Sequence, residues 1–292
     1  MKSKKARWKG LDRHRPRPWK EPTKCIFCGQ GGPLTQEHLF SNWTRRFVPR
    51  QMANYQSLRA TGYIDRTDFV IVRRQGDIRD TKIRCVCEAR CNNGWMRTKV
   101  DERARPFLLP LFRGDATRLT PEAQRIIATW AAMKAMVGEY DESSYVTTHH
   151  AHRRYLMDHL SPPPHGWAIW IGNYVRKDWP VRWLSTPFLL LPDKQAIKRK
   201  NRRATYYNGT SSTQVIGNLF IQIVRSPMHR FVARWRFALP RGETLFRIWP
   251  PTQFNIAWPG GAISDRSAEY IAGAVKELLA SIETERVAAG GK

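Results

Sequence analysis

The chain has 292 residues, of which 41% are apolar and 11% aromatic, so it can bury a core and is not a disordered basic tail. Fifty Lys and Arg residues against 24 Asp and Glu residues give a net charge of +26, which favours polyanionic partners, above all nucleic acid. Because the sequence contains no membrane-spanning apolar run, no amphipathic basic helix and no secretory signal, we expect an intracellular, reducing setting.

Residues 1–22 are expected to form a basic arm. Many lysines and arginines in this segment are offset only by Asp12 and Glu21, and its prolines disfavour regular structure. Two interpretations stay open: the arm follows a phosphate backbone, or it is a solvated terminus without a specific role.

The cysteines suggest a structural zinc site. Cys25-x-x-Cys28 places two thiols on one tight turn, and zinc takes four ligands in a tetrahedron. The second pair must come from Cys85, Cys87 and Cys91. We predict Cys87 and Cys91, because Cys91 lies at an expected helix start and Cys87 in the turn before it. Four thiolates leave no open position for chemistry, so this zinc would serve as scaffold.

The region after the first cysteine pair is expected to be β-rich and then helical. Two runs of β-forming residues, Thr67–Arg73 and Arg79–Cys85, flank the turn dipeptide Gly76-Asp77, and this pattern predicts a β-hairpin. A helix is predicted to begin near Cys91 and to end before Pro106.

Three polar residues near the cysteines are candidates for chemistry. A neutral His38 imidazole can take a proton from water, and the adjacent Glu37 carboxylate suits Mg²⁺. Asn92 directly follows Cys91, so a zinc-bound Cys91 would also position a second oxygen ligand. Because neighbours on a strand point to opposite faces, Glu37 and His38 share one site only if the strand end is irregular.

The sequences Cys25-Ile26-Phe27-Cys28-Gly29, Leu34-Thr35-Gln36-Glu37-His38 and Cys91-Asn92-Asn93-Gly94-Trp95-Met96 resemble the cysteine-flanked branch of the HNH endonuclease superfamily, especially its bacterial and phage members. The resemblance covers about residues 23–105. It departs from the usual pattern in two places. The second cysteine pair has one extra residue between its members, and the asparagine that orients the base is not evident in residues 80–84.

The resemblance implies a ββα-metal, treble-clef-like nuclease module. In such a module His38 would be the general base, and Glu37 and Asn92 would hold Mg²⁺ or Mn²⁺ against the scissile phosphate. The products would carry 5′-phosphate and 3′-hydroxyl ends.

The remaining chain is predicted to be helical and then rich in antiparallel strands. A helix is predicted from a cap at Thr120 to Gly138, with one apolar face formed by Ile126, Trp130, Met133 and Val137. The other predicted elements are a helix over 151–160, strands over 167–172, 181–191, 214–224 and 229–239, and an amphipathic helix over 264–285.

Two basic groups in this part of the chain are candidate phosphate contacts. The strand predicted over 229–239 would present Arg230, Arg234 and Arg236 on its outer face. A connection before it contains Arg199, Lys200, Arg202 and Arg203. The alternative for both groups is ordinary solvated charge.

The sequence thus predicts an α+β protein with a basic arm (1–22), a zinc-stabilised nuclease module (23–115) and a helical and β-rich accessory domain (116–292). We expect a metal-dependent endonuclease acting on nucleic acid, with double-stranded DNA as the preferred candidate and RNA left open. The alternatives are a catalytically inactive, zinc-containing nucleic-acid-binding protein and a packaging role in a phage or mobile element.

Overall fold

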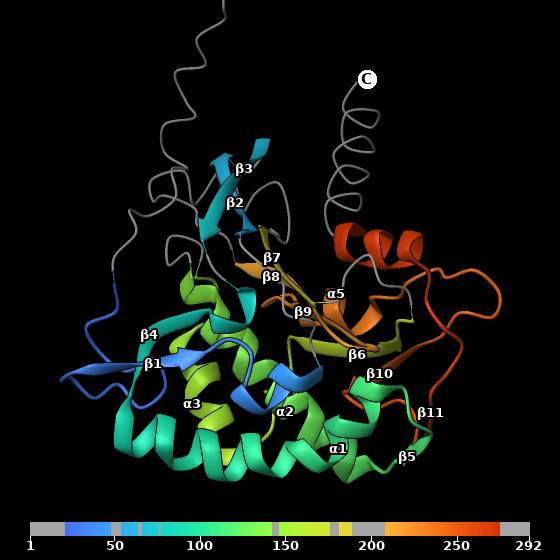
Figure 1. Ribbon diagram of the computed structural model, residues 1–292, viewed down its shortest axis with the longest axis horizontal. Helices are drawn as coiled ribbons and strands as arrows, with labels where there is room; N and C mark the ends of the chain where they lie inside the picture. Colours follow the sequence, from blue (N-terminus) through green and yellow to red (C-terminus); the bar gives the residue numbers. More distant parts are fainter. Residues whose placement is uncertain are drawn as a thin grey trace, which may run out of the picture.

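The structure is a computed structural model that describes residues 21–47, 54–63, 66–75, 77–141, 146–175, 181–188 and 208–274. Within these ranges the protein is α+β: helices pack against antiparallel sheets, and residues 265–274 form a C-terminal helix (Figure 1). Nearly all of the predicted basic arm lies outside the described residues.

A small two-stranded sheet carries the first candidate residues. Strand β1 (Leu34–His38) runs antiparallel to β4 (Lys82–Cys87), and the register shifts at the bulge between Thr35 and Gln36. Short 3₁₀ helices follow β1 (η2, Asn42–Phe47) and precede β4 (η3, Ile78–Asp80). The bulge lies before Glu37, and Glu37 and His38 pair in unbroken register with Ile83 and Lys82, so it does not by itself turn both side chains to one face.

The predicted hairpin is wrong in its pairing. Strand β3 (Arg66–Gln75) pairs with β2 (Asn54–Tyr63), whereas β4 pairs with β1. Asp77 caps η3, its side chain accepting a hydrogen bond from the Arg79 backbone N–H at 2.9 Å, and so does not form a two-residue turn. The chain therefore turns away from β3 before β4 begins.

A long helical segment follows β4. It begins at η4 (Glu88–Asp101), a π-type helix kinked at Gly94, and continues as α1 (Glu102–Arg113). The predicted helix is therefore too short at both ends, since the structure starts earlier and passes through Pro106. Burial of the leucines on its inner face offsets the missing proline N–H, and the helix ends at Gly114, whose φ of +77° suits glycine.

Helix α2 (Pro121–Gly138) is the central helix, and its predicted bounds are confirmed. The four residues of the predicted apolar face are buried, but burial extends around the helix, because every residue from 126 to 138 is buried. Contacts with η4, α1, α3 (His150–His159), β9 and β10 surround α2, and such a helix needs no polar face (Figure 1).

The large sheet has the order β10-β6-β9-β8-β7, with antiparallel neighbours. Its strands are β6 (Trp167–Asn173), β7 (Val181–Phe188), β8 (Gly209–Ile216), β9 (Leu219–Arg225) and β10 (Leu245–Trp249). A separate pair joins β5 (Thr117–Leu119) to β11 (Ile256–Trp258).

Two predicted strands differ from the structure. The run over 214–224 is a hairpin, because Gly217 turns with a φ of +56° and lies too close to the Phe112 carbonyl for any side chain. The strand over 229–239 begins instead as helix α5 (His229–Arg234). Val232 and Trp235 are three residues apart, so a helical turn buries both in one cluster, which strict alternation could not.

Buried apolar side chains from Cys25 to Trp258 form one continuous cluster that crosses the predicted boundary at residue 115. The division into two domains stays a prediction. No helix in the described part of the chain is long and apolar enough to cross a membrane.

The cap of α2 can be tested by substitution. Thr120 Oγ1 accepts a hydrogen bond from the Ala123 backbone N–H at 3.2 Å, so Thr120→Ala should lower the free energy of unfolding by about 1 kcal/mol. Urea denaturation would measure the change. An unaltered midpoint would show that this cap contributes nothing.

Candidate functional site

The first cysteine pair lies on a knuckle anchored to β4. The Cys25 carbonyl accepts a hydrogen bond from the Gly29 N–H at 2.9 Å, and the Cys25 N–H donates to the Gln30 carbonyl at 2.9 Å. Gly29 has a φ of +74°, which glycine adopts without strain. The Ile26 N–H donates to the Cys85 carbonyl at 3.0 Å, so the knuckle is joined to the strand that leads to the second cysteine pair.

The structure brings together the four cysteines selected from the sequence. The sulfur atoms of Cys25, Cys28, Cys87 and Cys91 all lie within 4.8 Å of one another. The two closest pairs are Cys25 with Cys91 at 3.5 Å and Cys28 with Cys87 at 3.6 Å. Four thiols in this arrangement could bind a metal such as zinc.

Cys85 is not part of this cluster. Its side chain is fully buried, and burial raises its pKa far above the usual range of a thiol. Within the cluster, the hydrogen bond between the Cys25 and Cys91 sulfurs lowers the pKa of Cys25 to about 4 and raises that of Cys91. The cluster thus favours a thiolate, the form that binds metal.

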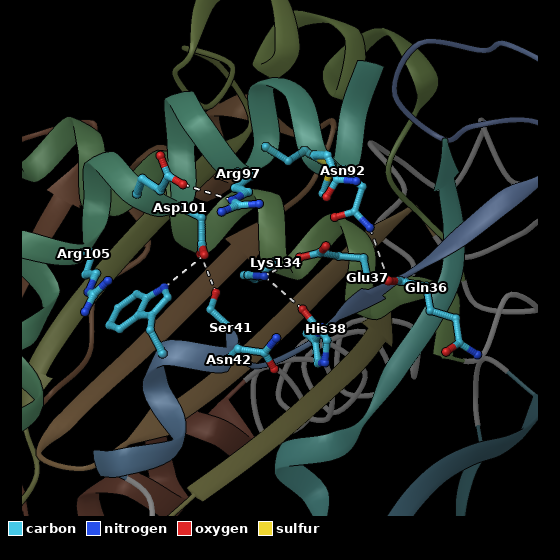
Figure 2. Close-up of a pocket in the computed structure, with 14 residues that line it drawn as sticks. Gln36, Glu37, His38, Ser41, Asn42, Asn92, Arg97, Asp101, Arg105 and Lys134 are labelled. Atoms are coloured by element: carbon cyan, nitrogen blue, oxygen red, sulfur yellow. Dashed lines mark hydrogen bonds and ion pairs between the residues drawn. The ribbon is translucent and has the colours of Figure 1, made fainter. Parts of the chain in front are cut away.

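Glu37, His38 and Asn92 line one pocket of about 490 Å³. Glu37 and His38 come from the end of β1, and Asn92 comes from η4, one residue after a cysteine of the cluster (Figure 2). The side-chain amide of Asn92 donates to the Gln36 carbonyl at 3.3 Å, which joins η4 to β1 beside the bulge.

Lys134 of α2 reaches into the same pocket and was not predicted. Its Nζ donates to Glu37 Oε1 at 2.6 Å and to the His38 carbonyl at 2.9 Å (Figure 2). The Lys134 side chain is 1% exposed and that of Glu37 is 11% exposed. Burial disfavours the charged amine, but the carboxylates of Glu37 and Asp101 outweigh it and raise the pKa of Lys134. The sequence signal that could have identified this residue is a lysine placed within the apolar run of α2.

The environment of His38 favours a neutral imidazole. Burial lowers its pKa, and the positive charge of Lys82, its partner across the sheet, lowers it further. No hydrogen bond to the His38 ring is found among the described residues, and the contact from Lys134 ends on the His38 backbone carbonyl. Asn42 lines the same pocket.

Asp101 joins three segments around the pocket. Its Oδ1 accepts hydrogen bonds from Trp130 Nε1 at 2.9 Å and from the Ser41 hydroxyl, the second of which is drawn in Figure 2. Its Oδ2 accepts one from Trp43 Nε1 at 3.0 Å. The end of η4, helix α2 and the segment after β1 are therefore held by one carboxylate.

Two arginines line the pocket and are further residues that the sequence did not single out. Arg97 is exposed and donates to Glu102 at 3.0 Å, and the Arg105 guanidinium lies 6.0 Å from the Trp43 ring centre.

Arg230, Arg234 and Arg236 are not among the described residues that line this pocket. Arg230 and Arg234 are exposed on α5, and Arg236 follows it and donates to the Ala233 carbonyl at 2.9 Å, so the expected cationic sheet face is wrong. Arg199, Lys200, Arg202 and Arg203 lie outside the described residues. Phosphate contacts by either group stay a prediction.

A scan against protein-family models and searches of curated proteins and of solved structures found no match to this chain. The geometry of the chain's own residues therefore carries the functional interpretation.

The zinc content of cysteine variants tests which of the two cysteines of β4, Cys85 or Cys87, is a zinc ligand. We expect the purified protein to bind about one zinc ion per chain, Cys87→Ser to lose it, and the matched variant Cys85→Ser to keep it. Elemental analysis of the purified variants would measure this. Loss of zinc from Cys85→Ser with retention by Cys87→Ser would contradict the assignment.

Proposed function

We propose that this protein is a metal-dependent endonuclease of the HNH type that hydrolyses phosphodiester bonds in nucleic acid. One observation carries the proposal: Glu37, His38 and Asn92 line a single pocket beside four clustered cysteines. The zinc cluster would act as scaffold, because Cys91 and Asn92 are adjacent in the chain.

The local chain path supports this proposal. Strand β1 pairs with β4 although η2, β2, β3 and η3 lie between them in the chain, and the helical segment η4 follows β4 directly. Two antiparallel strands and a helix are the elements of a ββα-metal module. The knuckle is hydrogen-bonded to β4, and η4 begins at the residue that follows β4. The same elements thus hold the proposed scaffold and the proposed catalytic residues.

The donor set around the pocket fits a hard divalent cation. Glu37 Oε1 is paired with Lys134, while Glu37 Oε2 and the Asn92 side-chain oxygen accept no hydrogen bond from the described residues. Oxygen ligands suit Mg²⁺ or Mn²⁺, which retain waters and also bind substrate phosphate. When bound by Glu37 and Asn92, such an ion would stabilise charge on the scissile phosphate.

The protein's own groups have separate roles in the proposed reaction. The neutral His38 imidazole takes a proton from a water molecule, which attacks the phosphorus as the bond to the 3′ oxygen breaks. The departing 3′ oxygen takes a proton from solvent and becomes the 3′-hydroxyl. Lys134 holds Glu37 in place through the hydrogen bond from its Nζ to Glu37 Oε1 (Figure 2). Arg97 and Arg105, on the pocket lining, contact flanking phosphates.

The substrate is proposed to be double-stranded DNA. The net charge of +26 favours association with a phosphate backbone whatever its sequence. Such association should weaken steeply as salt is raised.

One observation favours the alternative of a catalytically inactive nucleic-acid-binding protein. Glu37 is already paired with a buried ammonium group, and a charge neutralised in this way attracts a divalent cation less strongly. Salt-dependent DNA binding without cleavage in Mg²⁺, Mn²⁺ or any other divalent ion would establish this alternative.

The nuclease proposal is tested by removing the base. His38→Ala should slow cleavage of duplex DNA in Mg²⁺ by roughly 100-fold or more, because general base catalysis contributes about that much. The matched control is His159→Ala, an exposed histidine on α3, which should cut at the parental rate. Cleavage by His38→Ala as fast as the parent would refute the assignment.

Lys134 should act as a positioning residue for Glu37. Lys134→Met leaves a buried carboxylate without its partner, and breaking a buried pair costs about 3–5 kcal/mol of stability. The double variant Glu37→Leu with Lys134→Met should recover most of the stability and still fail to cut. Urea denaturation and cleavage assays on the parent and both variants would measure both effects. A stable, fully active Lys134→Met protein would contradict the role.

A further inference from the structure

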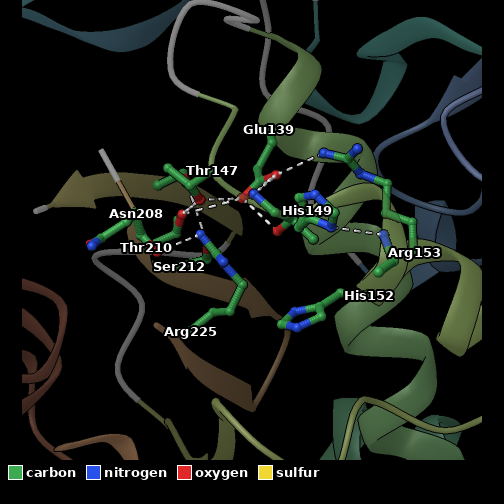
Figure 3. Close-up of polar contacts among 12 residues, drawn as sticks. Glu139, Thr147, His149, His152, Arg153, Asn208, Thr210, Ser212 and Arg225 are labelled. Carbon is green, nitrogen blue, oxygen red and sulfur yellow. Dashed lines mark hydrogen bonds and ion pairs between the residues drawn. The ribbon is translucent and has the colours of Figure 1, made fainter. Parts of the chain in front are cut away.

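A second buried polar cluster lies away from the pocket, where the end of α2 and the start of α3 cover the large sheet (Figure 3). Arg225 of β9 is directly opposite Trp167 of β6 and Thr210 of β8, so these three side chains share one face of the sheet. Arg153 of α3 and Glu139, the C-cap residue of α2, complete the cluster.

The Glu139 carboxylate is satisfied mainly by neutral groups. Its Oε1 accepts hydrogen bonds from the hydroxyls of Thr147 at 2.8 Å, Thr148 at 2.9 Å and Thr210 at 3.2 Å. Its Oε2 accepts one from the Thr148 backbone N–H at 3.1 Å. The nearest guanidinium nitrogen, Arg153 Nη2, is 3.5 Å from Oε2 and makes no hydrogen bond to it.

Both arginines of the cluster have guanidinium N–H groups that donate no hydrogen bond. Arg153 and Arg225 are each 4% exposed. Arg153 Nε and Nη2 and Arg225 Nε are buried and have no hydrogen-bond partner. Arg225 Nη2 donates to the Asn208 carbonyl at 3.0 Å, and no ion pair joins Arg225 to a carboxylate in the described part of the chain.

The cluster therefore carries more positive than negative charge. Two guanidinium groups face one carboxylate, and burial lowers the pKa of Arg225 only to about 10, so it remains charged at neutral pH. Buried charges in proteins are normally paired, because removing an ion from water is costly. The unpartnered donors of Arg153 and Arg225 suit an anion with several acceptor oxygens.

His152 offers a third donor beside the arginines. Its Nδ1 accepts a hydrogen bond from Trp167 Nε1 at 3.0 Å, so in the neutral ring the proton is on Nε2. Burial, and then the charge of Arg225, lower the pKa of His152 to about 4, which keeps the ring neutral. Figure 3 shows this ring on the same side of the cluster as Arg225.

We propose that the cluster binds one phosphate group through Arg153 and Arg225, with His152 as an additional donor. A tetrahedral oxyanion matches the planar fork of a guanidinium group and supplies the missing negative charge. Because the two arginines are only 4% exposed, the ligand is a free phosphate or the terminal phosphate of a nucleic acid, not the backbone of a duplex. The proposal does not depend on nuclease activity.

Titration calorimetry on the full chain tests the proposal at constant ionic strength, with chloride as the balancing anion. Inorganic phosphate should bind the parent at one saturable site. Arg153→Met should weaken binding at least tenfold, whereas Arg154→Met, its exposed neighbour on α3, should bind as the parent does. Arg225→Lys keeps the charge but loses the fork, and it should also bind more weakly.

Three outcomes would overturn the proposal: no saturable binding by the parent, equal loss in Arg153→Met and Arg154→Met, or unchanged binding in Arg153→Met and Arg225→Lys. If Arg153→Met does not fold, the decision rests on the parent and on a crystal soaked in selenate, where an anomalous peak beside Arg225 is expected.

Binding of a short oligonucleotide with and without a 5′-phosphate identifies the source of the bound phosphate group. Phosphate-dependent oligonucleotide binding supports a terminal phosphate, and binding of inorganic phosphate alone supports the free ion.

Discussion

The buried ammonium group of Lys134 constrains the arrangement of the whole candidate site. Its side chain is 1% exposed, so its charge must be matched inside the protein. The Glu37 carboxylate and the His38 carbonyl are its hydrogen-bond acceptors, and both belong to the end of β1. Any shift of β1 relative to α2 would leave a charge unpaired. The central helix thus determines where the two proposed catalytic side chains lie.

The same requirement applies along the rest of α2. Because Gln124 and every residue from 126 to 138 are buried, polar side chains among them need partners. Gln124 donates to the Leu119 carbonyl at 3.2 Å, and Glu139 accepts four hydrogen bonds at the opposite end. Asp101 accepts from the Trp130 indole of the same helix. The polar groups of α2 therefore orient the small sheet, η4 and the large sheet with respect to one another.

The cysteine cluster and the Lys134 pair act on the pocket from two sides. Cys91 joins the cluster to Asn92 through one peptide bond, while Lys134 approaches Glu37 from the core. In the proposed enzyme, zinc would restrain the helix that carries Asn92, and the lysine would restrain the strand that carries the base. Loss of either restraint should therefore impair the same pocket through different elements.

The sequence by itself determined the local features. The spacing of the cysteines, the adjacency of Asn92 to Cys91 and the bounds of α2 depend on neighbours in the chain, and local patterns express them directly. Only the tertiary structure decided the pairing of β4 with β1, the helix at 229–234 and the partnership of Lys134 with Glu37. All three features depend on which groups, distant in the chain, are buried against one another. The free energy of removing those groups from water together cannot be read from any short stretch of sequence.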